Sequence, residues 1–184
     1  AEVAFSEKIN CFFGNNGMGK TNILDSIYYL SFCKSHIHTP DTQLIRFGED
    51  MCVLQGFYDF EGKTEELFCA IRNKQRKQFK RNKKEYDKLS DHIGLLPLVM
   101  ISPADTDLIQ GGSEDRRRFL DLIISQQDKK YLYSLIQYNK ALTQRNALLK
   151  EQNLDASLFE ALDLQLVRFG EYIYMKRKEL VESL

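Results

Sequence analysis

The sequence lacks a long hydrophobic run, an excess of charge of either sign and closely paired cysteines. No apolar stretch in the 184 residues approaches the roughly 20 residues that a transmembrane helix needs, so we expect no membrane partner. No secretory signal is visible in the first residues. The 26 Lys and Arg residues balance the 26 Asp and Glu residues, so bulk charge alone does not indicate nucleic-acid binding.

The four cysteines, Cys11, Cys33, Cys52 and Cys69, lack the close pairing of a zinc site and lie in apolar or strand-like surroundings. Four cysteines can form two disulfides, but the nucleotide motif described next favours a reducing compartment. We therefore predict free, mostly buried thiols in a cytoplasmic protein.

The clearest motif is GNNGMGKT at residues 14–21, which fits the phosphate-binding loop pattern G-x-x-x-x-G-K-[ST]. Its glycines let successive N–H groups face phosphate oxygens, Lys20 can reach the β- and γ-phosphates, and the Thr21 hydroxyl can hold Mg²⁺. Alternation over residues 8–13 predicts a strand before the loop, and apolar spacing predicts a helix over residues 20–32. We interpret the segment as a loop for ATP and magnesium; the alternative is a chance turn before a helix.

The predicted secondary structure changes from strands to helices near residue 112. The earlier part holds all three prolines and predicts paired strands over 51–60 and 64–73, extended by 75–81, and a buried strand within 95–102. Thereafter Ser113 predicts a helix N-cap, and no glycine or proline follows until Gly170. Two apolar stripes predict antiparallel helices joined by a turn at 151–157. Their members are Tyr131, Leu135, Tyr138, Leu142 and Leu149, then Leu158, Leu162, Leu166, Phe169 and Ile173. We expect an α/β lobe over residues 1–112 and a helical domain over 113–184.

Positive charge is concentrated at residues 72–88, which hold nine basic and two acidic residues. Two interpretations stay open: a surface that neutralises nucleic-acid phosphates, or a β-hairpin whose charged edge prevents aggregation. The arginines at 116–118 either meet DNA phosphate or form salt bridges with Asp115 and Asp121. The candidate DNA-binding residues are Arg76, Lys77, Lys80, Arg81, Arg116 and Arg117.

A second acidic motif, an apolar run ending in Asp, completes the magnesium site of phosphate-loop ATPases. The apolar residues 98–101 are the nearest candidate, but Ser102 and Pro103 follow them. The sequence also ends within a helical pattern, so we expect it to be part of a longer protein.

Residues 14–30 closely resemble the phosphate loop and first helix of the RecF family of bacterial recombination and repair ATPases. A second similar block runs over 101–121 and ends in Arg-Arg-Arg-Phe-Leu-Asp, and a weaker one covers 43–48. The resemblance implies part of a P-loop ABC-type ATPase head, related to the heads of SMC proteins, with an inserted α-helical hairpin domain. The family's first strand would precede Ala1, and its signature loop and acidic motif would follow Leu184.

The resemblance also implies a function in DNA replication, recombination and repair, within the response to DNA damage. RecF-like proteins bind ATP, dimerise around it, recognise gapped or junction DNA and, with RecO and RecR, help to load RecA. ATP hydrolysis is implied for a full-length protein and is not expected of these 184 residues alone. Lys20 and Thr21 would have the catalytic roles, within an ATP site formed by Gly14, Asn15, Asn16, Gly17, Met18, Gly19, Lys20, Thr21 and Asn22. The alternatives are an SMC-like structural head and a small-molecule phosphate-loop kinase.

Overall fold

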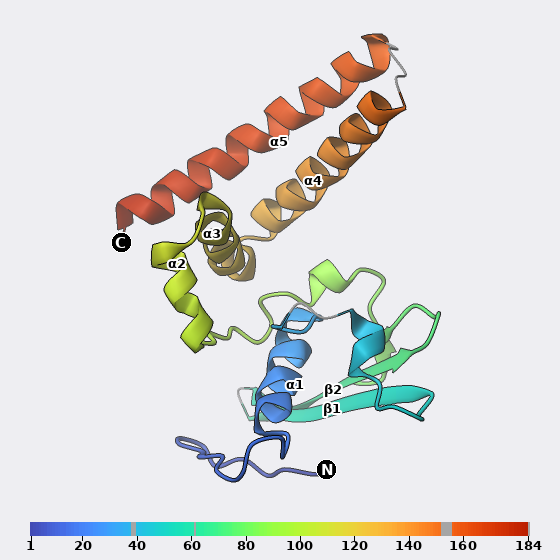
Figure 1. The fold of residues 1–184 in the computed structure, drawn as a ribbon, viewed down its shortest axis with the longest axis vertical. Coiled ribbons are helices and arrows are strands. Elements are labelled where there is room, and N and C mark those ends of the chain that lie inside the picture. The colour runs from blue at the N-terminus through green and yellow to red at the C-terminus, as the bar shows by residue number, and fades with distance from the viewer. Residues whose placement is uncertain (38–39, 61, 152–155, 184) are drawn as a thin grey trace. The chain divides into compact units, whose positions relative to one another are not determined.

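The computed structural model describes residues 1–37, 40–60, 62–151 and 156–183, and the chain forms two compact units (Figure 1). The first unit is Ala1–Asp87 and the second is Lys88–Leu184. The chain is mixed α/β, with an antiparallel sheet in the first unit and helices in the second. The domain boundary expected at residue 112 lies inside the second unit and stays a prediction.

The first unit combines one helix with a four-stranded antiparallel sheet. The elements are α1 (Lys20–Phe32), a 3-10 turn η1 (Asp41–Leu44) and the strands β1 (Met51–Phe60), β2 (Lys63–Arg72), β3 (Gln78–Arg81) and β4 (Lys84–Glu85). The strands pair in the order of the sequence. In β1 exposed and half-buried residues alternate, as expected for a strand with one face on the core.

The core of this unit lies between the C-terminal half of α1 and the sheet. The buried apolar residues are Tyr28, Tyr29, Leu30 and Phe32 of α1, Cys33 directly after it, Leu67, Cys69, Ala70 and Ile71 of β2, and Phe79 of β3. Gly56 allows β1 to approach the helix, because a Cβ atom there would lie 2.9 Å from Leu30 Cδ1 and 2.8 Å from the Tyr58 ring. This packing fixes the helix that follows the phosphate loop.

The second unit is helical. It contains η2 (Leu89–Asp91), η3 (Pro103–Thr106), α2 (Asp107–Gln110), α3 (Ser113–Gln127), α4 (Lys129–Lys150) and α5 (Ala156–Ser183). Its core joins Ile124 of α3, Tyr131 of α4 and Ile173 of α5. None of the described helices is both long and apolar enough to span a membrane.

Several predicted elements are confirmed. The predicted helix over residues 20–32 coincides with α1, and the predicted strand pair coincides with β1 and β2 to within one residue. The two apolar stripes lie on α4 and α5. Glu61, between the two predicted strands, and residues 152–155 of the turn predicted at 151–157 lie outside the described part of the chain.

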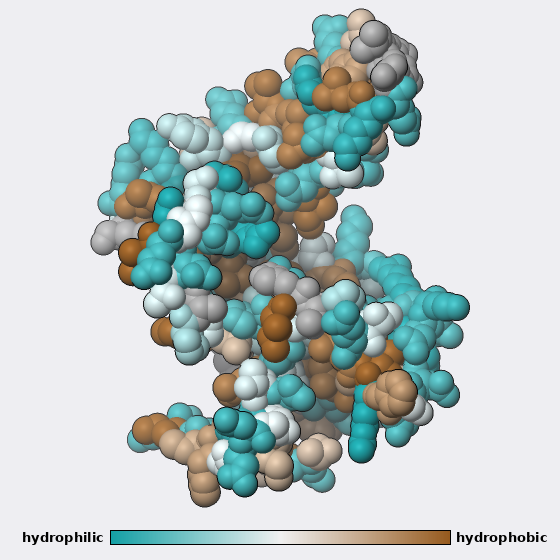
Figure 2. Space-filling model, viewed as in Figure 1, coloured by the Kyte–Doolittle hydropathy of each residue, from teal (hydrophilic) through white to brown (hydrophobic). Residues whose placement is uncertain are grey.

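Two predicted strands are wrong. Residues 8–13 and 95–102 are irregular, and some of their apolar residues are largely exposed, Phe13 by 93% and Ile101 by 85%. Hydrophobic residues, drawn in brown, are visible on the molecular face that Figure 2 shows. A strand needs a neighbouring strand for its backbone hydrogen bonds, and the described residues provide none at either place. In the second segment the Leu98 N–H instead donates to the Gln126 side chain of α3 at 2.9 Å.

Three details of the helices and strands were not predicted correctly. The N-cap of α3 is Gly112, with no side-chain cap, because the helix already includes Ser113. The helical stretch after residue 113 is broken at Asp128, whose carboxylate caps α4 by accepting from the Tyr131 N–H at 2.9 Å. Strand β4 was missed, although Asn82 and Lys83, with φ of 49° and 69°, form the tight turn that precedes it.

Candidate nucleotide-binding site

The phosphate loop depends on three glycines with positive φ. Gly14, Gly17 and Gly19 have φ angles of 145°, 81° and 88°, a region that other residues rarely adopt. A Cβ atom at any of the three would meet no atom within 4 Å. The backbone conformation, and not packing, therefore requires glycine, and the space beside the loop is open for an anion.

Lys20 folds back over this loop from the first position of α1. Its ammonium donates to the Gly14 carbonyl at 2.8 Å and to the Asn15 carbonyl at 2.7 Å. Gly19 caps the helix, and its carbonyl accepts the first helical bond, from the Ile23 N–H at 3.2 Å. The free N–H groups of the first turn and the Lys20 cation therefore gather positive charge at one place.

The residues fit a nucleoside triphosphate. The loop offers glycine backbone, a cation and a helix N-terminus, which together form a phosphate site. Asn15, Asn16, Met18, Thr21 and Asn22 are exposed around it, so their side chains are accessible to a ligand. Among the described residues no group of three or more His, Cys, Asp or Glu could hold a metal ion.

Asp25, one turn after the loop, is a structural residue. It is 6% exposed, and its two carboxylate oxygens accept from the Ser35 hydroxyl at 2.8 Å and the His36 N–H at 2.7 Å. These bonds tie the segment after α1 back onto the helix. The Asp25 carboxylate is therefore engaged by residues 35 and 36.

Known proteins with similar sequences and structures indicate the family of this chain. No family model matches the sequence. The chain is 72% identical, over 183 residues, to the DNA replication and repair protein RecF of Parabacteroides distasonis, covering all of this chain and 50% of that protein. It is 57% identical to RecF of Phocaeicola vulgatus, covering 98% of this chain and 49% of that protein. The chain belongs to the RecF family. It spans about half the length of the curated relatives that it matches.

Solved RecF structures have the same fold. The structure of the recombination mediator protein RecF with ATP, in the RecFOR pathway, matches with a TM-score of 0.91 at 30% identity. The match covers 98% of this chain and 49% of that one. A RecF–ATPrS structure matches with a TM-score of 0.86 at the same identity, covering 92% and 47%. The fold is therefore that of the ABC-type ATPase head expected for RecF.

At the other end of α1, the basic segment at residues 72–88 supplies a structural lysine. Lys77 pairs with Asp41 at 2.9 Å and donates to the Tyr29 hydroxyl at 3.0 Å and the Cys33 carbonyl. The Lys77 side chain is 17% exposed, and its ammonium has three partners inside the first unit. These contacts favour a structural role for Lys77, and its predicted contact with DNA phosphate stays a prediction.

Burial keeps the neighbouring thiols protonated. It raises the pKa values of Cys33 and Cys69 to about 12 each. All four cysteines are free, as predicted, although only these two are buried and Cys11 is exposed.

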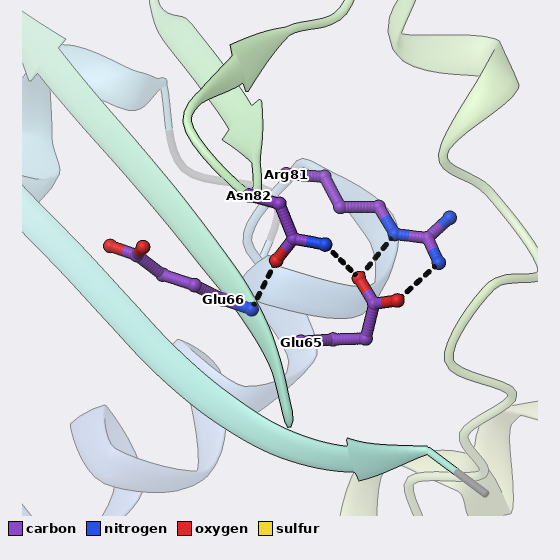
Figure 3. A network of polar contacts seen from close by, with 4 residues as sticks. All are labelled: Glu65, Glu66, Arg81 and Asn82. Carbon is purple, nitrogen blue, oxygen red and sulfur yellow. Dashed lines mark hydrogen bonds and ion pairs between the residues drawn. The ribbon is translucent and has the colours of Figure 1, made fainter. Parts of the chain in front are cut away.

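Arg81 is also engaged within the hairpin. Its guanidinium donates to both oxygens of Glu65, at 2.7 Å and 2.9 Å, and the Asn82 amide donates to the same carboxylate at 2.7 Å (Figure 3). Asn82 Oδ1 in turn accepts from the Glu66 N–H at 2.9 Å (Figure 3). This network connects β2 to the β3–β4 turn and uses the Nε and Nη2 edge of the Arg81 guanidinium, so we leave Arg81 out of the proposed DNA surface.

Of the remaining predicted DNA contacts, Arg76, Arg116 and Arg117 are exposed and Lys80 is half-buried. Arg76 is exposed and donates to the Asp87 carbonyl at 3.2 Å, and Lys80 lies 5.9 Å from the centre of the Phe68 ring. Arg116 donates to the Leu108 and Gly111 carbonyls, and Arg117 to the Ser113 hydroxyl at 2.9 Å. The predicted salt bridges of this cluster are confirmed only for Arg118, which pairs with Glu114 at 2.6 Å and Asp115 at 4.0 Å. Asp121 pairs elsewhere.

Proposed function

We propose that this chain provides the ATP-binding loop of a RecF-type DNA replication, recombination and repair protein. The observation that carries the proposal is the loop at residues 14–21, with its three positive-φ glycines and Lys20, in a chain 72% identical to RecF. ATP would be held by residues 14–22, with Lys20 at its phosphates and Thr21 at the magnesium ion.

ATP acts in this proposal mainly as a switch for homodimerisation. Binding at the loop would favour a dimer that recognises gapped or junction DNA, and hydrolysis would release it. The activity of the full-length protein would be that of an ATPase, with a carboxylate motif that residues 1–184 do not contain. The partners would be RecO and RecR, and through them RecA, in the cytoplasm.

The rival functions have less support. A small-molecule kinase needs an enclosed acceptor pocket, whereas the hollows described in this chain are shallow grooves on the helical unit. A purely structural SMC-like head shares the fold but does not account for the identity to RecF along the whole chain.

The first test is titration with a fluorescent ATP analogue in the presence and absence of Mg²⁺. We expect saturable binding that Lys20→Ala weakens at least about tenfold, because a charge-assisted contact to phosphate contributes about 1.5–3 kcal/mol. Lys63→Ala is the matched control, since Lys63 is an exposed lysine of β2 with no role in the loop.

Equal affinity of the Lys20→Ala variant and the wild-type chain would refute the assignment of the loop. Loss of binding in both Lys20→Ala and Lys63→Ala would indicate a general effect of charge and would also count against it. Thr21→Ala should lose the Mg²⁺ dependence of binding while keeping a weaker affinity in its absence.

A further inference from the structure

A shallow groove of about 540 Å³ runs between α4 and α5 of the helical unit. Residues from both helices line it: Lys130, Tyr133 and Ser134 of α4, and Arg168, Phe169, Glu171, Tyr172 and Met175 of α5. Its size lies within the range of ligand sites in proteins. Neither the phosphate loop nor the basic hairpin contributes to it.

Close packing of the two helices fixes the walls of the groove. Gly170, beside Phe169, admits the Tyr138 ring, because a Cβ atom there would lie 3.2 Å from Tyr138 Cε2. Tyr172 is held by its hydroxyl, which donates to Asp128 at 2.9 Å. The Tyr172 ring is thus positioned before any ligand arrives, which lowers the entropy cost of binding.

One ring of the groove is left open. Tyr133 is 56% exposed and meets Phe169 edge to face, with ring centres 6.0 Å apart and an interplanar angle of 78°. An edge-to-face pair leaves at least one ring face of Tyr133 uncovered. An uncovered tyrosine face on a rigid helix is a surface on which a planar group can stack.

Two cations flank the rings. Lys130 Nζ lies 4.3 Å from the centre of the Tyr172 ring, and Arg168 Cζ lies 5.7 Å from that of Phe169. Among the described residues neither forms an ion pair with a carboxylate. Glu171 is the single acidic residue of the lining, so the groove has an excess of positive charge.

We propose that this groove binds single-stranded DNA, with one base stacked on Tyr133 and the adjoining phosphates at Lys130 and Arg168. The inference rests on the proposed function, which makes DNA the partner, and adds a site for an unpaired strand. An open ring flanked by cations suits a strand whose bases are accessible, since stacking on aromatics requires unpaired bases. A duplex keeps its bases stacked inside and would offer only phosphates.

The test is fluorescence anisotropy with a labelled 12-residue oligothymidine and the whole chain. Tyr133→Ala should raise the Kd about 5- to 100-fold, as loss of one stacked base does, and Tyr133→Phe should restore binding. The Lys130→Gln/Arg168→Gln double variant should lower the slope of log K against log salt by about 1 to 1.5. Matched controls are Tyr174→Ala and Lys140→Gln, at exposed positions of the same helices outside the groove. Circular dichroism checks that each variant stays helical.

An unchanged Kd in Tyr133→Ala, together with an unchanged salt slope in the double variant, would overturn the proposal. So would binding of gapped duplex without any binding of oligothymidine, although DNA binding by the chain would then stand. Competition by polyglutamate as strong as that by oligothymidine would overturn it too, because any polyanion would then suffice. If no DNA binds while the ATP analogue still does, both this site and the DNA-binding part of the proposed function fail, and the nucleotide site remains.

Discussion

The same residue type has opposite roles at two positions of the first unit. Lys20 and Lys77 are both lysines in segments chosen from the sequence as phosphate-binding. Among the described residues, the Lys20 ammonium donates to carbonyls of its own exposed loop, which a phosphate can replace. Lys77 neutralises Asp41 and bonds to Tyr29 and Cys33 inside the unit. Replacing those three partners by one phosphate would leave Asp41 unpaired, so this lysine stabilises the fold.

The Glu65 carboxyl is a single residue that makes the free energy of unfolding depend on pH. The Arg81 guanidinium, together with Asn82, lowers the pKa of this carboxyl below its usual value. Its stabilising contribution is therefore present above the unfolded-state pKa of about 4.3 and is lost as the pH falls through the lower folded-state value. We expect Glu65→Gln to reduce the free energy of unfolding at pH 7 and to flatten its decline on acidification. Urea titrations between pH 3 and pH 7 measure both effects.

The control for this prediction is Glu49→Gln, an exposed acid outside the strands. A decline with acidification that is equally steep in Glu65→Gln and wild type would contradict the role of the pair.

The three long helices are joined by polar contacts as well as by their apolar stripes. Arg177 of α5 donates to both oxygens of Asp121 on α3, at 2.8 Å and 2.9 Å, and the Tyr131 hydroxyl of α4 donates to the same carboxylate. Arg145 of α4 pairs with Asp163 of α5 at 2.6 Å. Arg145, which lies between Leu142 and Leu149 of the apolar stripe, therefore forms a second polar connection, this one between α4 and α5.

We expect Arg177→Gln to destabilise the helical unit by about 1–3 kcal/mol, because it leaves Asp121 without its cation in a partly buried site. Arg118→Gln is the matched control on α3: its pair with Glu114 is exposed, 60% and 68% by side chain, and such pairs contribute about 0–1 kcal/mol. Urea unfolding followed by circular dichroism compares the two. If both variants lose the same free energy of unfolding, the contacts among α3, α4 and α5 stabilise the unit no more than an exposed ion pair does.

For the whole molecule, a net charge of zero makes DNA binding depend on where the charges lie. Lys77 and Arg81 are engaged internally, whereas Arg117 is exposed and forms no ion pair among the described residues. We expect Arg117→Ala to weaken binding of gapped DNA and to lower its salt slope by about 0.9, the value for one phosphate contact. Anisotropy at several salt concentrations measures this, with Lys140→Ala as control. An unchanged slope would exclude Arg117 from the DNA surface.

The sequence by itself determined the elements whose signals are local. The glycines and Lys20 of the loop, the bounds of α1, the β1–β2 pair and the apolar stripes of α4 and α5 follow from spacing along the chain. The resemblance to RecF added the ATPase-head fold, and the comparisons agree with it.

Only the tertiary structure decided which polar residues are free and which apolar segments are strands. The basic residues at 72–88 look alike in the sequence, yet Asp41 and Glu65, far from them in the chain, select Lys77 and Arg81 for structural pairs. Residues 95–102 have the composition of a buried strand but bond to α3 through Gln126. Pairing depends on partners distant in the sequence, and local pattern carries no information about them.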